Sequence, residues 1–251
     1  MNKIISWNLN GLLSCIKHSS FESISALAPD IICCQEIRTK LQHEVIPGYQ
    51  HFWNPGERDG YSGTLTMTKQ MPKQTIAGLG VPALDLEGRV LTTKFSDKFV
   101  VNAYAPNSQK NLIRHQIRIQ WDEAFRSFLC ELLGEKPVIA CGDFNVTMSE
   151  LDTYPENLRQ YWAQLGYTSD ERSNLETLLE CGFVDAYRHL YPAATGSYTW
   201  WSNRLNKRDE NRGWRLDYFF VSENMSGRIQ NVTHLSNVMG SDHCPILLEL
   251  R

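Results

Sequence analysis

The sequence predicts a single α/β domain with strands that are buried on both faces. Residues 30–36 and 137–141 are almost uninterrupted apolar runs, which is typical of strands covered on both sides. The segment after Ser108 instead repeats apolar residues about every 3.6 positions, as an amphipathic helix does. The chain has no internal repeat, low-complexity tract or Pro/Ser-rich linker, so we expect residues 1–251 to form one domain.

The same patterns place the individual strands. We expect them at residues 4–9, 30–36, 90–95, 99–104, 137–141, 214–221 and 246–250. The third and fourth are joined by Ser96-Asp97-Lys98, which is typical of a hairpin turn. A short helix at residues 21–27 should end before Pro29, because proline disfavours helical geometry in the residue that precedes it.

The long helix is expected to begin with Ser108 as its N-cap. Its apolar stripe consists of Leu112, Ile113, Ile117, Trp121, Phe125, Phe128, Leu129 and Leu132. The opposite, solvent-facing side carries Lys110, Arg114 and Arg118. Residues 150–173 are polar and irregular, and we expect a long surface loop with partial helix there.

Composition predicts a soluble protein of the cytoplasm. No stretch approaches the roughly 18 apolar residues that a membrane helix needs. The N-terminus lacks the apolar core and cleavage site of a secretory signal. The 7 cysteines form no CxxC pair, which favours a reducing compartment and argues against structural zinc.

A nucleic-acid partner would have to bind a local basic surface, because the net charge of -3 gives no overall attraction to DNA. One stretch qualifies, since it interleaves cations with tryptophans: Trp200, Trp201, Arg204, Lys207, Arg208, Arg212, Trp214 and Arg215.

Polar side chains follow the ends of the expected strands. They are Asn8 and Asn10, Glu36, Tyr104 with Asn107, Asp143 with Asn145, Asp217, and the adjacent pair Asp242-His243. Groups placed directly after buried strands gather at one edge of a sheet, where loops build sites on a rigid scaffold. The residue types indicate metal-assisted hydrolysis.

Each group suits a role in that chemistry. Glu36 and Asp242, with the amide oxygen of Asn8, offer the hard oxygen ligands that Mg²⁺ prefers. Asp143 could polarise a water molecule, which Asn145 could hold.

Asp217 could orient His243, as the acid does in an Asp-His pair.

Every one of these residues also has a purely structural interpretation. Asn8 and Asn10 could form a turn around Gly11, Glu36 could be a solvated edge charge, and Gly142-Asp143 is a common turn pair. Tyr104 could be a packing residue. The conjunction favours a site, because independent turns would have to place acids and amides at successive strand ends by accident.

The chain resembles the exonuclease III-like apurinic/apyrimidinic endonucleases of the endonuclease/exonuclease/phosphatase superfamily. The matching blocks run from end to end: residues 5–12 (ISWNLNGL), 34–36 (CQE), 60–63 (GYSG), 104–107 (YAPN), 142–146 (GDFNV), 213–219 (GWRLDYF) and 240–245 (GSDHCP). The resemblance implies a four-layer sandwich, with two mixed β-sheets packed face to face and flanked by helices.

The resemblance also implies roles for the residues at the strand ends. Glu36 would be the principal ligand of Mg²⁺, which Mn²⁺ could replace, with Asn8 and Asp242 close by. Asp143 would activate the attacking water. A second metal site would use Asp143, Asn145 and His243.

His243, paired with Asp217, would contact the scissile phosphate. Tyr104 and Asn107 would support that phosphate or its leaving group. Trp200, Trp214 and Leu216 match the walls of a pocket for an extrahelical abasic sugar. The further candidate DNA contacts are Arg204, Tyr61, Arg114, Lys110 and Arg208.

The expected function is a Mg²⁺-dependent repair nuclease, a monomer acting on double-stranded DNA with abasic or 3'-blocked lesions. It would cut 5' to abasic sites, leave a 3'-hydroxyl and trim 3' ends, in a cytoplasmic location beside the nucleoid and away from membranes. One alternative is mainly 3'-end processing, because Leu13 and Ser14 stand where relatives commonly carry Arg-Ala. A less favoured alternative is a phosphatase on other phosphoesters.

Overall fold

Two six-stranded sheets form the centre of the computed structural model, which describes residues 1–157, 166–203 and 207–251. One sheet has the order β11-β12-β1-β2-β4-β3, and its strands span Ile229–His234, Ile246–Leu250, Lys3–Asn8, Ile31–Gln35, Thr64–Thr68 and Gln50–Asn54. The other has the order β5-β6-β7-β8-β10-β9, and its strands span Gln74–Ala77, Val90–Lys94, Phe99–Tyr104, Val138–Asp143, Asp217–Ser222 and Phe183–Asp185.

Both sheets are mixed, and each has one parallel pair at its centre. β1 runs parallel to β2, and β7 runs parallel to β8, whereas the remaining pairs are antiparallel. β2, β7 and β8 are buried along their whole length, and β1 is buried from Ile4 onwards, as the apolar runs predicted.

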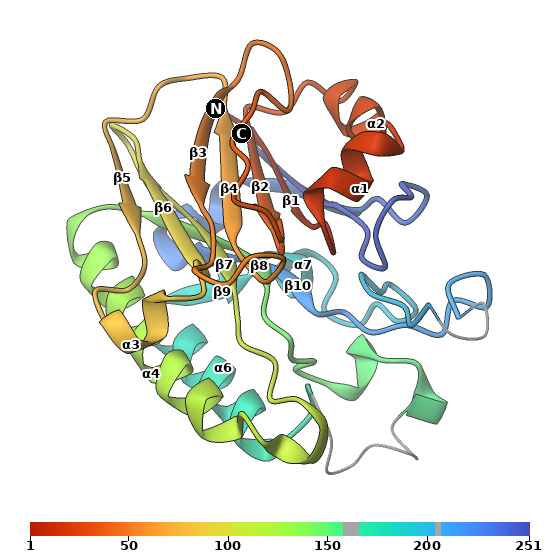
Figure 1. Ribbon diagram of the computed structural model, residues 1–251. Coiled ribbons are helices and arrows are strands. Elements are labelled where there is room, and N and C mark those ends of the chain that lie inside the picture. The colour runs from red at the N-terminus through yellow and green to blue at the C-terminus, as the bar shows by residue number, and fades with distance from the viewer. Residues whose placement is uncertain (158–165, 204–206) are drawn as a thin grey trace.

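Figure 1 shows the two sheets with helices on their outer faces. Three clusters of buried apolar side chains fill the spaces between these layers. Between the sheets, Ile4, Cys33, Ile139 and Phe219 belong to one cluster. Ile5 and its neighbours on the opposite face of β1 pack beneath α1 (Leu12–Lys17) and α2 (Phe21–Ser25). On the far side, the second sheet is covered by α4 (His115–Glu135) and α6 (Ser169–Glu180). The four-layer sandwich is therefore confirmed.

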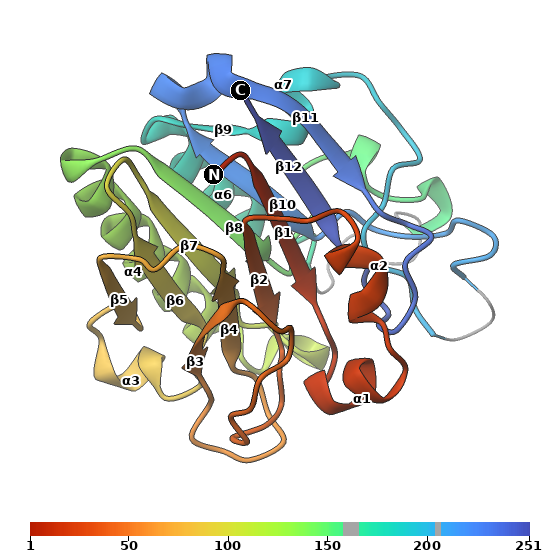
Figure 2. The ribbon, with the colours of Figure 1, turned by 90° about the horizontal axis from the view of Figure 1, so that it is seen from above.

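Shorter elements complete the chain. They are α3 (Pro82–Asp85), α7 (Ala186–Leu190) and the 3-10 helices η1 (Lys110–Leu112), η2 (Glu150–Asp152) and η3 (Glu223–Arg228). Seen from above, α7 lies beside β11 (Figure 2). Among the described helices, none combines the length and apolar character needed to cross a bilayer.

The expected start of the long helix is wrong. α4 begins at His115, because Gln109, Asn111 and Leu112 have φ angles of 59°, 59° and 56°, which no right-handed helix accommodates. Ser108 does not cap it. Its hydroxyl donates instead to the Glu171 carboxylate of α6, at 2.6 Å.

The expected faces of α4 need correction as well. Arg118 is buried rather than solvated, since it donates to both carboxylate oxygens of Asp122 and to the carbonyl of Pro106. Ile113 and Ile117 are 73% and 41% exposed, so they do not belong to the buried stripe. The partial helix expected within residues 150–173 is present, because α6 begins at Ser169 with a capping box between Thr168 and Glu171.

Candidate active site

The ends of the parallel strands meet at one edge of the two sheets. Asn8 at the end of β1 pairs with Gln35 of β2, directly before Glu36. In the other sheet, Asp143 at the end of β8 pairs with Tyr104 of β7 and with Asp217 of β10. The expected residues therefore converge, because the paired strands of both sheets end at the same edge of the fold.

Asn8 connects the two sheets within this edge. Its amide nitrogen donates to Glu36 Oε2 at 3.0 Å and to Asp143 Oδ2 at 2.8 Å. Its amide oxygen accepts the backbone N–H of Asn10 at 2.9 Å. A fully buried amide thus fixes one carboxylate from each sheet at the same point.

Glu36 also pairs with Arg38 in the same loop. Both residues have positive φ angles, 54° and 53°, in the segment that leaves β2. The Arg38 guanidinium donates to Glu36 Oε1, with its Nε at 3.0 Å. The partly exposed guanidinium of Arg38 therefore neutralises part of the Glu36 charge.

His243 lies between two carboxylates and is only 5% exposed. Its Nδ1 is 2.8 Å from Asp217 Oδ2, and its Nε2 is 3.7 Å from Asp143 Oδ2. Burial lowers the pKa of His243, but the charges of Asp217 and Asp143 outweigh burial and raise it to about 10. The expected hydrogen bond between His243 and Asp217 is present, and the imidazole is held in its charged form.

In Asp143 the surroundings favour the uncharged form, in contrast to His243. Burial raises its pKa, His243 lowers it and Asp217 raises it, with a net rise to about 7. Its Oδ1 accepts the backbone N–H of Asn145 at 2.8 Å. A carboxyl with a pKa near neutrality and a fixed orientation is suited to exchange a proton with water.

Asp242 reaches the same edge from the segment before β12. Its Oδ1 accepts from the Asn10 amide at 2.9 Å, and its Oδ2 accepts from Trp200 Nε1 at 3.0 Å. Asp242 and His243 can both serve the site because regular β12 starts only at Ile246.

Two asparagines and a tyrosine border the carboxylates. Asn107 donates to Asn145 Oδ1 at 2.9 Å, and Asn145 donates to the carbonyl of Ala105 at 3.0 Å. Tyr104 is buried beside Glu36, and burial followed by the Glu36 charge raises the pKa of its hydroxyl well above its usual range. Tyr104 therefore stays protonated and can donate a hydrogen bond.

The expected sugar-binding residues also border the site. Trp200 forms isolated bridges with Trp214 and with His243, and its ring lies 6.4 Å from the His243 ring. Thr199 Oγ1 accepts the N–H groups of Leu216 and Asp217, which fixes the start of β10 against this segment.

The outer candidate DNA contacts differ in their surroundings. Arg114 donates to the Tyr61 hydroxyl at 2.5 Å and to Glu87 at 2.7 Å, at the wall of a cavity of about 640 Å³. Lys110 is exposed. Arg208 donates to three backbone carbonyls, and Arg204 lies outside the described residues. DNA contact by these residues stays a prediction.

Sequence reasoning missed Arg89, which lies directly behind Tyr104. Its guanidinium is 4.5 Å from the centre of the Tyr104 ring, and it donates to the Tyr104 carbonyl at 3.1 Å and to Tyr61 at 3.2 Å. In the sequence Arg89 is a single charge before a strand, so only its burial, at 2% exposure, reveals this role.

The donor set fits a hard divalent cation. Glu36 and Asp143 are carboxylates held by one amide, and Asp217 Oδ1 is buried with no partner among the described residues. Ligand atoms of Asp143, Asp217 and His243 lie within 4.8 Å of one another. Carboxylate oxygens are the ligands that Mg²⁺ prefers.

Two face-to-face mixed sheets with an Asp-His pair and converging carboxylates at one edge define a phosphoester-hydrolysing class of enzyme. A model of the Endonuclease/Exonuclease/phosphatase family matches residues 5–243, and the chain belongs to that family. Within it, the chain is a hydrolase of the exodeoxyribonuclease and AP endonuclease type.

Three relatives support that placement. The chain is 44% identical to an exodeoxyribonuclease of Bacillus subtilis, over 98% of both chains. It is 39% identical to the DNA repair nuclease APEX1 of Danio rerio, covering 99% of this chain and 82% of that one. The crystal structure of an AP endonuclease from Leishmania major superimposes with a TM-score of 0.90 at 30% identity, over 100% of this chain and 87% of the other.

Proposed function

We propose that this chain is a Mg²⁺-dependent DNA repair nuclease that hydrolyses the phosphodiester 5' to an abasic site in duplex DNA. The observation that carries the proposal is the paired arrangement of His243 and Asp143. His243 is held charged by Asp217 at 2.8 Å, while the adjacent Asp143 has a pKa raised to about 7. One group can stabilise negative charge on a phosphate while the other accepts a proton.

Hydrolysis then divides between these residues. Asp143 accepts a proton from a water molecule that Asn145 orients, and the water oxygen forms a bond to phosphorus. The bond from phosphorus to the 3'-oxygen of the preceding nucleotide breaks on the opposite side, leaving a 3'-hydroxyl after protonation. His243 donates a hydrogen bond to a non-bridging phosphate oxygen, which stabilises the charge that develops there.

Glu36, Asn8 and Asp242 would hold the metal. A second site at Asp143, Asn145 and His243 would require a neutral His243, so it is an alternative to the charged imidazole of this mechanism. Bound Mg²⁺ supplies positive charge to the phosphate, with Mn²⁺ as a substitute. Tyr104 and Asn107 support the phosphate or the leaving oxygen through neutral hydrogen bonds.

Selectivity for a missing base is assigned to Trp200, Trp214 and Leu216. The Trp200 ring lies 6.4 Å from the His243 ring, and Trp200 forms a bridge with Trp214. With Leu216, which directly precedes Asp217, these side chains can enclose a sugar without a base, whereas a normal nucleotide is too large for such a pocket. The relatives named for DNA repair and for AP endonuclease activity support this substrate. We further propose that the chain acts as a cytoplasmic monomer near the nucleoid.

The test compares two duplexes that differ only in one abasic residue. We expect incision of the abasic duplex with Mg²⁺ or Mn²⁺, no incision with excess chelator, and little cutting of the intact duplex. Equal cutting of both duplexes, or full activity in chelator, would contradict the proposal.

A second candidate, mainly 3'-end processing, is favoured by Leu13. This side chain is 49% exposed on α1 beside the site, and it offers no charge to a phosphate. A 3'-5' exonuclease from Neisseria meningitidis also shares the fold, with a TM-score of 0.84 at 25% identity. Faster removal of a 3'-blocking group at a nick than incision at an internal abasic site would favour this candidate.

A further inference from the structure

Arg208, in the basic stretch after Trp201, makes its hydrogen bonds to backbone carbonyls of this protein. Its guanidinium donates to the carbonyl oxygens of Ser241 at 2.9 Å, Ser236 at 2.9 Å and Val238 at 2.8 Å. All three belong to residues 236–241, the loop that leads from β11 to Asp242 and His243. A guanidinium can reach several carbonyls at once because its donors form a rigid planar fork.

Trp201 fixes Arg208 from the other side. The guanidinium lies 4.7 Å from the centre of the Trp201 ring, and Trp201 is 2% exposed. The backbone N–H of Trp201 donates to the carbonyl of Asp242 at 3.0 Å. Arg208 and Trp201 therefore hold consecutive peptide groups, at Ser241 and Asp242.

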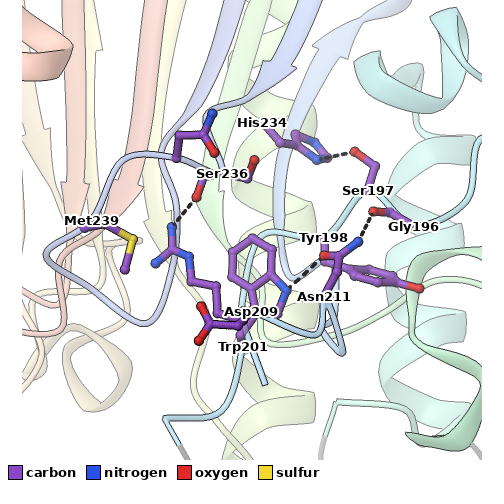
Figure 3. Close-up of a pocket in the computed structure, with 11 residues that line it drawn as sticks. Gly196, Ser197, Tyr198, Trp201, Asp209, Asn211, His234, Ser236 and Met239 are labelled. Atoms are coloured by element: carbon purple, nitrogen blue, oxygen red, sulfur yellow. Dashed lines mark hydrogen bonds between the residues drawn. The ribbon is translucent and has the colours of Figure 1, made fainter. Parts of the chain in front are cut away.

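The 236–241 loop is anchored differently on its two sides. On the side of α1, Val238 packs against the apolar cluster beneath the helices, and the Cys15 thiol donates to the Gly240 carbonyl at 3.4 Å. A cavity of about 460 Å³ separates part of this loop from the segment at Trp201 and Asn211, and Ser236 and Met239 line it (Figure 3). Ser236 and Asn237 are exposed, and Met239 is 62% exposed. On the cavity side, the hydrogen bonds from Arg208 to the loop carbonyls are therefore the contacts that hold the loop in place.

The end of this loop is continuous with the active site. The Ser241 hydroxyl donates to the Asn8 carbonyl at 2.8 Å and accepts the backbone N–H of His243 at 3.1 Å. A shift of Ser241 would therefore move Asp242, His243 and the strand end at Asn8 together.

We propose that Arg208 is a positioning residue that places Asp242 and His243 by holding the 236–241 loop through its three carbonyls, and that it is not a DNA contact. The expected effect on catalysis rests on the proposed function, because Asp242 and His243 belong to the proposed active site. Displacement of a reacting group by about 1 Å can cost on the order of 100-fold in rate. Loss of Arg208 should therefore slow the chemical step and leave duplex binding almost unchanged.

Two substitutions and one matched control test the proposal. R208Q removes the charge and the planar fork. R208K keeps the charge, but its single ammonium group cannot reproduce three directed hydrogen bonds. R228Q is the control, because the Arg228 guanidinium also donates to a main-chain oxygen, that of Arg251, directly after β12.

The first readout separates chemistry from binding on an abasic duplex. For R208Q we expect kcat to fall roughly 10- to 100-fold with KM within about twofold, and R208K to lie between R208Q and the wild type. The slope of log Kd against log salt should stay unchanged, whereas loss of one phosphate contact would reduce it by about 0.9. A reduced slope with unchanged kcat would overturn the proposal.

The second readout does not depend on activity. Hydrogen exchange should become at least tenfold faster at residues 236–243 in R208Q, with β7 and β8 as in the wild type and R228Q unaffected. Native exchange at residues 236–243 in both Arg208 variants would overturn the proposal. If the wild type fails to cut the abasic duplex, the proposed function fails, while exchange still decides the role of Arg208.

Discussion

At the scale of single residues, the site depends on charges that are balanced inside the protein. Asn8 binds Glu36 and Asp143 with one amide nitrogen, and His243 lies between Asp143 and Asp217. Burial alone would favour the uncharged forms of His243 and Asp143. Because the groups lie close together, the imidazole stays charged and the pKa of the Asp143 carboxyl lies near neutrality. The chemistry therefore follows from the pairing of the groups.

Asp143→Asn should abolish most incision while the fold persists. The amide matches the carboxyl in shape but cannot accept the proton of the attacking water, so we expect kcat to fall roughly 100- to 10,000-fold. The measurement is single-turnover incision of an abasic duplex, with near-UV circular dichroism as a control for folding. Near-native turnover by this variant would exclude Asp143 as the proton acceptor.

Asp217→Asn should lower the pKa of His243. The carboxylate at 2.8 Å is the strongest charge that favours the imidazolium, so its loss moves the pKa down from about 10. Titration of the imidazole by NMR measures this directly, and His51, at the other end of the fold, provides an internal reference. An unchanged His243 titration would show that Asp217 does not control its charge.

At the scale of elements, the parallel pair β7–β8 depends on a close approach at Gly142. This residue has a φ of 148°, and a Cβ placed there would overlap the carbonyl oxygen of Ala103 on β7. Only glycine allows the two strands to stay in register up to Tyr104 and Asp143.

Gly142→Ala should therefore destabilise the protein by about 3 kcal/mol or more. Urea unfolding is the measurement. Gly134→Ala is the matched control, because Gly134 lies in α4 with open space around it and should gain about 0.5–1 kcal/mol from better helix propensity. Equal effects of the two substitutions would contradict this interpretation of the strand pair.

His234, at the end of β11, should make the fold sensitive to acid. Burial, followed by the nearby Arg215 charge, lowers the pKa of His234 to about 3, and its ring stacks on Tyr187 at 4.4 Å. The unfolded chain binds a proton near pH 6.5 and the folded chain does not. This contribution to stability is thus complete above pH 6.5 and is lost as the pH falls towards 3.

His234→Asn should reduce the dependence of the unfolding free energy on pH between pH 6.5 and pH 3. Between pH 6 and pH 4, the wild type should lose about 1.4 kcal/mol more stability per pH unit than the variant. Urea unfolding at several pH values measures the difference. Parallel pH profiles would contradict a neutral His234 in the folded protein.

Elements that depend on a local sequence pattern could be predicted, whereas those that depend on contacts with distant residues could not. The strands at residues 99–104 and 246–250 were predicted with the bounds that the structure shows, because their apolar patterns are local. The start of α4 could not be predicted, because Ser108 binds Glu171, a residue 63 positions away. Burial of Arg118 likewise depends on the Pro106 carbonyl, which no helical periodicity reveals.

At the scale of the whole molecule, two sheets with matching strand ends bring distant parts of the chain to one edge. The sequence could indicate which polar residues would gather there, because each follows a buried strand. It could not indicate that Arg38 would pair with Glu36, or that Arg208 would bind loop carbonyls, since both depend on loop geometry. The sequence therefore indicates which side chains form the site, and the fold determines which groups they pair with.

The most direct test of the proposed function is to map the ends that the enzyme produces. A duplex with one abasic residue, labelled at the 5' end of the damaged strand, is cut with Mg²⁺ and the labelled product is offered to a DNA polymerase. The proposed mechanism predicts a single product that ends directly before the abasic residue and is extended at once, because it carries a 3'-hydroxyl. A product cut on the 3' side of the abasic residue, or one that the polymerase cannot extend, would contradict the mechanism.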